Sequence, residues 1–181
     1  MRRGDLLKLT GLSVTVLSAM ARRGLLPFDR DEVRADRGWA DYSARQVVSL
    51  AWALRLTQAG LRQESAAAAV RTGQEALFEA DHSPDSSEDL FLGVVGIGTL
   101  DIDPETGETA LYTLIETLAG TLDCVTQSVR TLLASGSGRP QHLVFINASE
   151  TVRRVLERAD ESRVREELLA ALPPALRGEP C

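Results

Sequence analysis

The chain has 181 residues, of which 44% are hydrophobic and 25% are charged, and its 20 basic and 26 acidic residues give a formal net charge of -6. This is the composition of a globular protein with one medium or two small domains, which excludes disorder throughout the chain. No apolar run is long enough to cross a bilayer, and the charges of Asp5 and Lys8 interrupt the N-terminus before a signal-peptide core can form, so we expect a cytoplasmic protein without a membrane partner.

The first predicted elements are two short helices joined by a tight turn. Four leucines have a spacing that lets two helices bury them against each other: Leu6, Leu9, Leu12 and Leu17. Gly11 suits a turn conformation that a side chain would resist. Ser13 stands at the N-cap of a second helix, from Val14 to about Arg23, which Gly24 terminates. A short helix, a glycine turn and a capped helix together predict a helix-turn-helix.

A small hairpin and a third helix are predicted next. Trp39 and Tyr42 can anchor the hairpin, and Ser43 can cap the helix that follows it. The apolar residues of this helix are Val47, Leu50, Leu54 and Leu56. We expect it to end near Gly60, and a short helix through Ala66 to Ala69 closes the first module.

Four segments in this order resemble the DNA-binding module of the MerR family of transcriptional regulators. They are Gly4-Asp-Leu-Leu-Lys-Leu-Thr-Gly-Leu-Ser, Arg22-Arg-Gly-Leu-Leu-Pro, Gly38-Trp-Ala-Asp-Tyr-Ser and Leu54-Arg-Leu-Thr-Gln-Ala-Gly-Leu. The resemblance covers about residues 3 to 70. It implies a winged helix-turn-helix, an inverted-repeat DNA site and distortion of the promoter. The chain departs from the family pattern, which has Arg and aromatic residues in the second helix and Arg in the wing, at Thr15, Ser18, Ala19, Met20, Ala40 and Asp41.

Basic residues concentrate in the same part of the chain. Residues 1 to 72 contain 12 basic and 7 acidic side chains, a net of +5, whereas residues 73 to 181 contain 8 and 19, a net of -11. Because phosphate neutralisation by Lys and Arg supplies most of non-specific DNA affinity, we predict double-stranded DNA as the partner. The predicted DNA-binding residues lie on the first two helices, the helix exit and the wing: Arg2, Arg3, Ser13, Thr15, Ser18, Arg22, Arg23, Arg34, Arg37 and Tyr42.

The chain changes character after Val70. Residues 81 to 89 are polar and acidic, contain a proline and have no apolar period, which predicts a boundary between a DNA-binding domain (1–80) and a second domain (81–181). The apolar run from Leu90 to Gly98 predicts a buried strand. Its glycines, Gly93, Gly96 and Gly98, lead into an acidic turn rather than a helix, so we reject a phosphate-binding loop.

Residues 109 to 134 carry an apolar stripe with alternating steps of four and three. Its members are Leu111, Ile115, Leu118, Leu122, Val125, Val129 and Leu132. This is the a/d seam of a coiled coil, so we expect one long helix that forms a homodimer interface through these seven residues. Two alternatives are that the stripe faces the core of its own domain, and that a strand at Ala110 to Glu116 is followed by a break at Gly120. Seven consecutive matches favour the helix.

The last part of the chain predicts a strand and further helix. His142 to Asn147 is a second buried-strand candidate, and Ser149 can cap the helix after it. The apolar face of this helix consists of Val152, Val155, Leu156 and Ala159, and the pattern continues through Val164, Leu168 and Leu169 to Pro173. Basic residues on the opposite face are balanced by Glu and Asp, which indicates solvated surface rather than a second DNA site.

No residue pattern in the chain indicates catalysis. His82 and His142 lack Cys, Ser or carboxylate partners at a spacing typical of a triad or a metal pair, and the acidic cluster from Asp101 to Glu108 is explained better as a turn. Cys124, expected in a helix core, and Cys181 support neither a disulfide framework nor a Cys-rich metal site. We therefore predict no enzyme, no metal and no cofactor.

These expectations combine into a mainly α fold. A winged helix-turn-helix would be followed by a small α/β or helical domain with a long coiled-coil-like helix. The favoured function is a dimeric, sequence-specific transcriptional regulator whose second domain dimerises and binds a small effector or a partner protein. The alternative is an adaptor, for example in a phage packaging or regulatory complex, whose helix-turn-helix has lost tight DNA binding and holds another protein.

Overall fold

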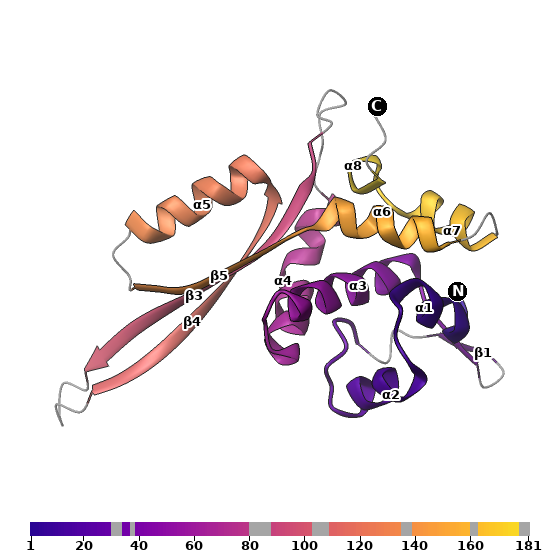
Figure 1. Cartoon of the computed structure of the whole chain (residues 1–181), viewed down its shortest axis with the longest axis horizontal. Coiled ribbons are helices and arrows are strands. Elements are labelled where there is room, and N and C mark those ends of the chain that lie inside the picture. Colours follow the sequence, from indigo (N-terminus) through magenta and orange to yellow (C-terminus); the bar gives the residue numbers. More distant parts are fainter. Residues whose placement is uncertain are drawn as a thin grey trace.

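The computed structural model of the chain describes residues 1–29, 34–36, 39–79, 88–102, 109–134, 139–159 and 163–177. Within these ranges the chain forms eight helices and five strands (Figure 1). Their order is α1 (Arg3–Thr10), α2 (Val14–Arg22), β1 (Arg34–Asp36), β2 (Trp39–Asp41), α3 (Ala44–Gln58), α4 (Gln63–Glu79), β3 (Leu90–Ile102), β4 (Thr109–Thr121), α5 (Leu122–Ala134), β5 (Arg139–Asn147), α6 (Ala148–Arg158), α7 (Arg163–Ala171) and α8 (Pro174–Arg177).

The second half of the chain is built on a three-stranded antiparallel sheet. Its strand order is β4-β3-β5, so β4 and β5 run parallel to each other on either side of β3 and are joined by α5. The glycines of β3 make room for side chains of β5. A Cβ atom at Gly93 would lie 2.1 Å from the ring of Phe145, and one at Gly96 would lie 2.1 Å from the ring of His142. These glycines therefore permit close strand packing, in agreement with the rejection of a phosphate loop.

One face of the sheet packs against the helices of the first half. Leu92 and Val94 point to this face and belong to one buried cluster that also includes residues of α1, α2, α3, α4 and α6. Gly73 brings α4 close to the sheet, because a Cβ there would lie 2.6 Å from Leu92 Cδ1. The fully buried Trp52 of α3 donates a hydrogen bond from Nε1 to the carbonyl oxygen of Ala148 in α6, at 3.1 Å. The two predicted domains thus share one core.

The opposite face of the sheet is covered by α5 (Figure 1). Val95 and Ile97 alternate with the residues of the first face and are buried, as is Val125 of α5. None of these three belongs to the main cluster. The sheet therefore separates a large core from a smaller one beneath α5.

The expectation of a mainly α fold with a long coiled-coil-like helix is wrong. A three-stranded sheet makes the fold mixed α/β, and the predicted helix is instead strand β4 followed by helix α5. The strand ends at Thr121, one residue after Gly120, whose φ is 144°; this is close to the alternative of a strand at Ala110 to Glu116 followed by a break at Gly120. In β4, Ile115 and Leu118 point to opposite faces because their separation is odd. The seam predicted as a dimer interface therefore does not exist as one surface.

Exposure varies along the residues of the predicted seam. Ile115 and Leu122 are exposed, Leu118, Val129 and Leu132 are half-buried, and Val125 is buried. The side chain of Leu111 lies outside the described residues. Cys124, which was expected in a helix core, is on α5 but exposed.

Both predicted strands of the second half are confirmed, and each is longer than expected: β3 extends to Ile102 and β5 begins at Arg139.

The predicted cap of α6 is wrong. Asn147 is the N-cap, since its Oδ1 accepts a hydrogen bond from the Glu150 amide at 2.7 Å. Ser149 lies inside the first turn, where its Oγ accepts from the Leu90 amide at 3.0 Å and donates to the Ala175 carbonyl at 3.1 Å.

An ionic cluster holds the start of β3 against α6. The guanidinium of Arg153 contacts both oxygens of Asp89, at 2.7 and 2.9 Å, and Asn147 Nδ2 donates to Asp89 at 2.6 Å. The hydrogen bond from Arg153, which has the largest effect, and the hydrogen bond from Asn147 hold the pKa of Asp89 below its ordinary value, although burial opposes this. Asp89 is therefore a carboxylate that contributes to stability in its ionised form.

Among the described residues, no single helix is long and apolar enough to cross a membrane. Together α1 and α2 reach the necessary length and composition, but they are bent by 103° relative to each other.

Candidate nucleic-acid interface

The first two helices have the geometry of a helix-turn-helix. Only three residues, 11 to 13, separate α1 from α2, and the two helices meet at 103°. Gly11 ends α1 in the left-handed conformation, with φ 73° and ψ 16°, and its amide donates to the Leu7 carbonyl at 2.9 Å. Helix-turn-helix units have angles of about 90–120° and turns of three to four residues that often contain Gly. Length, angle and turn residue all agree with this motif.

The second helix is anchored on one side and open on the other. Ser13 caps it as predicted, because its Oγ accepts a hydrogen bond from the Val16 amide at 3.3 Å. Leu17 and Met20 are buried in the main core. The open side carries five exposed residues, namely Val14, Thr15 and Val16 near the start of α2, and Arg22 and Arg23 at its end. We call these five residues the α2 surface.

Two apolar side chains on the α2 surface were not foreseen as part of a site. Val14 is 52% exposed and Val16 is 40% exposed. Apolar side chains on a recognition helix can contact thymine methyl groups in the major groove, or an apolar patch of a protein. The sequence signal was available, since both valines lie in the first turn after the N-cap, but periodicity alone does not tell which side of a nine-residue helix is covered.

Arg3 and Ser18 contact each other rather than presenting free polar groups. Arg3 Nη2 donates to Ser18 Oγ at 2.8 Å, and both residues are half-buried. This bond ties α1 to α2 and fixes the angle between them. Arg2 is exposed, and its backbone pairs with Asp41 at the end of the hairpin. The start of α1 thus contacts both α2 and strand β2.

The hairpin β1–β2 forms at the predicted position of the wing. The side chain of Arg34 and all of Arg37 lie outside the described residues.

The prediction that Tyr42 contacts DNA is wrong. Tyr42 is 9% exposed and its ring packs edge-on against Phe28, with centroids 6.3 Å apart, so it is a core residue.

Asp41, an acidic residue where the family pattern has Arg, is paired within the protein. Its Oδ1 accepts a hydrogen bond from the Met1 amine at 2.7 Å, and Glu167 of α7 lies 3.3 Å from the same amine. Burial lowers the pKa of the amine, but the hydrogen bond to Asp41 and the charge of Glu167 outweigh this, so the pKa is raised. Because the amine offsets part of the charge of Asp41, this wing residue repels DNA less than an unpaired carboxylate would.

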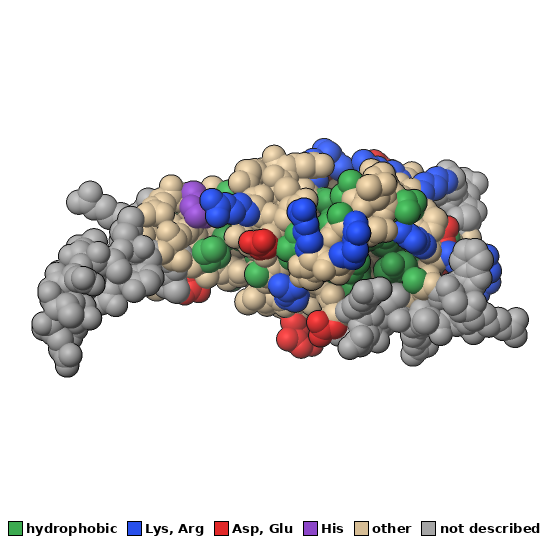
Figure 2. Space-filling view, turned by 90° about the horizontal axis from the view of Figure 1, so that it is seen from below, with side chains coloured by type: hydrophobic (Ala, Val, Ile, Leu, Met, Phe, Trp, Pro, Cys, Tyr) green, Lys and Arg blue, Asp and Glu red, His purple; other side chains and the backbone are tan. Residues whose placement is uncertain are grey.

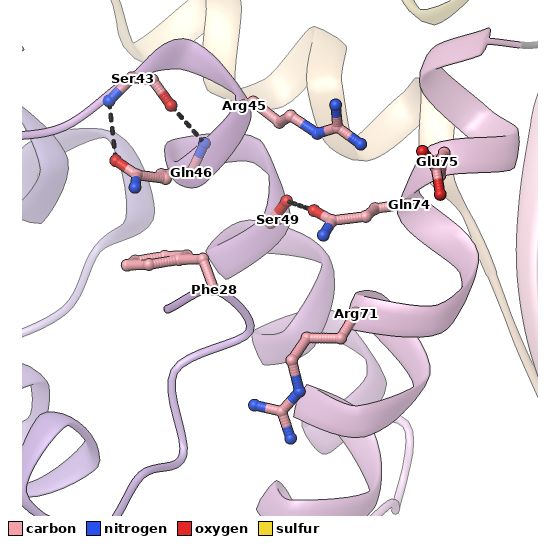
Figure 3. A pocket seen from close by; sticks show the side chains of 8 residues that line it. All are labelled: Phe28, Ser43, Arg45, Gln46, Ser49, Arg71, Gln74 and Glu75. Atoms are coloured by element: carbon pink, nitrogen blue, oxygen red, sulfur yellow. Dashed lines mark hydrogen bonds between the residues drawn. The ribbon is translucent and has the colours of Figure 1, made fainter. Parts of the chain in front are cut away.

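A polar pocket of about 330 Å³ lies between the start of α3, α4 and Phe28 (Figure 3). Arg71 Nη1 donates to the Leu26 carbonyl at 2.8 Å, which holds the segment after α2 against α4. Ser49 Oγ donates to Gln74 Oε1 at 2.7 Å. Glu75 also lines the pocket. This mixture of charges and the hydrogen bonds across it indicate a connection between elements rather than an anion site.

The side of the molecule that carries α2 is rich in basic residues. In Figure 1, α2 lies on the lower side, and Figure 2 views the molecule from below. Lys and Arg side chains are spread over the helical part of this face, among apolar side chains, whereas Asp and Glu are fewer there. Such a surface suits a polyanion.

A scan against models of known protein families found no match for this chain, and a search of curated proteins found no relative.

Proposed function

We propose that the protein is a sequence-specific DNA-binding regulator that inserts α2 into the major groove. The observation that carries this proposal is the pair of helices that meet at 103° across a three-residue turn with a left-handed Gly11. In a helix-turn-helix the second helix enters the groove with its N-terminal residues on base edges. Here those residues are Val14, Thr15 and Val16, and they are exposed.

The two ends of the α2 surface suit two different kinds of contact with DNA. Thr15 offers a hydroxyl for hydrogen bonds to bases, and the two valines offer methyl groups for thymine. Arg22 and Arg23 are at the other end, where guanidinium groups suit phosphate oxygens. The first three residues would therefore determine sequence preference and the two arginines would determine salt-dependent affinity.

The resemblance to the MerR module supports the same proposal. The hairpin β1–β2 and helix α3 follow α2 in the order that the resemblance implies. A regulator of this kind binds an inverted repeat as a dimer, and the homodimer remains part of the proposal although the predicted residues do not form one helical seam. Light scattering of the full chain tests it: we expect twice the mass of one chain at micromolar concentration, and the mass of a monomer would contradict it.

Selection of duplexes from a randomised pool by the full chain tests sequence-specific binding. We expect a consensus sequence, and Thr15→Ala should change the preference at one or two positions with a loss of about 1–3 kcal/mol on the selected site. Arg130→Gln, on the exposed side of α5, is a control that removes a charge away from the α2 surface. A selected pool with no consensus would contradict sequence-specific binding.

An adaptor is the second candidate, and the exposure of Val14 and Val16 favours it. Apolar side chains in the middle of an interface lose water more cheaply than charged ones, so these valines also suit a protein partner. The two candidates differ in their response to DNA. Failure of the full chain to bind any duplex at about 50 mM salt, where phosphate contacts are strongest, would favour the adaptor.

A further inference from the structure

A second pocket, of about 210 Å³, lies between α1, α3 and α6. It is lined by Thr10 and Gly11 at the helix-turn-helix turn, and by the side chains of Arg55, Arg154 and Arg158. The two helices that supply the arginines, α3 and α6, come from different halves of the chain, so neither sequence segment alone indicates this cluster.

The pocket has an excess of positive charge. Three of its lining residues are arginines and none is Asp or Glu. Arg55 Nη1 donates to Gln58 Oε1 at 3.1 Å and Arg158 Nη1 donates to the Leu9 carbonyl at 3.1 Å, so these bonds go to neutral oxygens. A guanidinium has five N–H donors, and one such bond leaves others for a ligand.

Arg154 has an acidic neighbour, but one that is shared. Its Nε lies 3.0 Å from Glu150, whose other oxygen lies 3.0 Å from Arg153 Nε. Arg153 also contacts both oxygens of Asp89, so Glu150 and Asp89 together balance Arg153 and Arg154. The positive charge of the pocket therefore comes from Arg55 and Arg158, whose hydrogen bonds go to neutral oxygens. Like charges held together destabilise the fold, and an anion between them relieves this repulsion.

We propose that this pocket binds a free oxyanion, a phosphate group of a small molecule being the chemistry that fits it best. Guanidinium groups match phosphate oxygens in bidentate geometry. The volume is smaller than the 300–1,000 Å³ or so typical of drug-sized ligands, which favours a compact anionic group. Because Gly11 and Arg158 both line the pocket, the ligand contacts the turn of the helix-turn-helix directly.

Phosphate groups of DNA are the other source of this chemistry, and the fold argues against them. In Figure 1, α6 lies on one side of α1 and α3, and α2 lies on the other. A duplex docked on the α2 surface would lie on the side away from α6. The pocket therefore suits a ligand that binds independently of DNA, and the inference does not rest on the proposed function.

Thermal unfolding of the full chain in inorganic phosphate, with sodium chloride at equal ionic strength as the reference, tests the pocket. At a phosphate concentration ten times Kd, we expect a rise in Tm of about 3–6 °C. Because phosphate also stabilises proteins non-specifically, the decisive quantity is the difference between variants. Arg55→Gln and Arg154→Gln should each lose at least half of the rise. Arg130→Gln, on the distant helix α5, is the matched control and should keep it.

Arg154→Gln guards against misfolding, because Arg154 is exposed and its partner Glu150 is a surface carboxylate. An equal rise in all variants would overturn the proposal, since the effect would then be that of phosphate on any protein. Anisotropy with a duplex distinguishes the source of the phosphate. A salt slope in Arg55→Gln equal to that of the wild type supports a free oxyanion, whereas a slope reduced by about one would assign the pocket to DNA and overturn it.

Discussion

Replacement of Gly11 by Ala should destabilise the protein by a calculable amount. Gly11 has φ 73° and ψ 16°, a left-handed conformation that costs an L-residue about 1–2 kcal/mol. A Cβ atom would meet only Arg158 Nη1, at 3.6 Å, so no steric clash adds to this cost. The lower entropy of the unfolded chain with Ala offsets about 0.4–1 kcal/mol. The net loss is about 1 kcal/mol, and Tm should fall by about 2–4 °C.

A series at Gly11 isolates the backbone conformation as the cause. Gly11→Asn should cost less than Gly11→Ala because Asn tolerates the left-handed region, and Gly11→Val should cost more because it is β-branched. Gly4→Ala is the matched control: Gly4 is in α1 with open space around its Cβ position, so its Tm should stay equal or rise slightly. Differential scanning calorimetry measures all four. Equal Tm values for Gly11→Ala and Gly4→Ala would refute the reasoning about the turn.

Three further changes test the core, the strand-to-helix junction and the ionic cluster. Trp52→Phe removes a buried hydrogen bond between α3 and α6 and part of a buried ring, so urea unfolding should show a loss of about 2 kcal/mol; a loss below about 0.5 kcal/mol would contradict the shared core. In Gly120→Ala, alanine must adopt a φ of 144° and its Cβ atom would lie 3.3 Å from Cys124 Cβ, so the same assay should show a loss of about 1–3 kcal/mol in unfolding free energy. An unchanged unfolding free energy would contradict this backbone conformation at the junction of β4 and α5. Since Arg153 lowers the pKa of Asp89, the stabilisation from Asp89 is present above pH 4 or so and is lost as pH falls through its folded pKa. The wild type should therefore exceed Asp89→Asn in stability at pH 7 and converge with it at about pH 2, and a constant difference would contradict the ion pair.

The local signals of the first 60 residues predicted the structure well. Ser13 and Ser43 cap α2 and α3 where expected, and both helices begin within a residue of their predicted starts. A cap acts on the backbone next to it, so a sequence window of a few residues contains the whole signal. The same holds for the glycine turn before Ser13.

In the second half of the chain, the spacing of the apolar residues led to a wrong prediction. Leu111 and Ile115 are four residues apart, a spacing that puts side chains on one face of a helix and also on one face of a strand. The Thr residues around them and the Ile favour strand, and Gly120 interrupts a helix. The number of heptad matches favours a helix more strongly than these local preferences favour a strand. The pairing of this segment with β3 stabilises it as a strand.

The exposure of some candidate DNA-binding residues follows from local signals. Thr15 and Arg22 on α2, and Arg23 directly after it, are exposed, and the cap at Ser13 fixes the position of this helix. The burial of Tyr42 depends on Phe28, fourteen positions earlier in the chain, and the paired state of Asp41 depends on groups at both ends of the chain. Contacts of this kind follow from tertiary packing and have no local signal.

The most direct test of DNA binding through α2 is the salt dependence of duplex affinity, measured by fluorescence anisotropy between about 50 mM and 200 mM salt. We predict that the full chain binds duplex DNA and that Arg22→Gln lowers the slope of log K against log salt by about one, because one phosphate contact is lost. Arg130→Gln, an exposed arginine on α5, should leave the slope unchanged. Equal slopes for Arg22→Gln and the wild type, or no binding by the wild type at the lower salt concentration, would contradict the account.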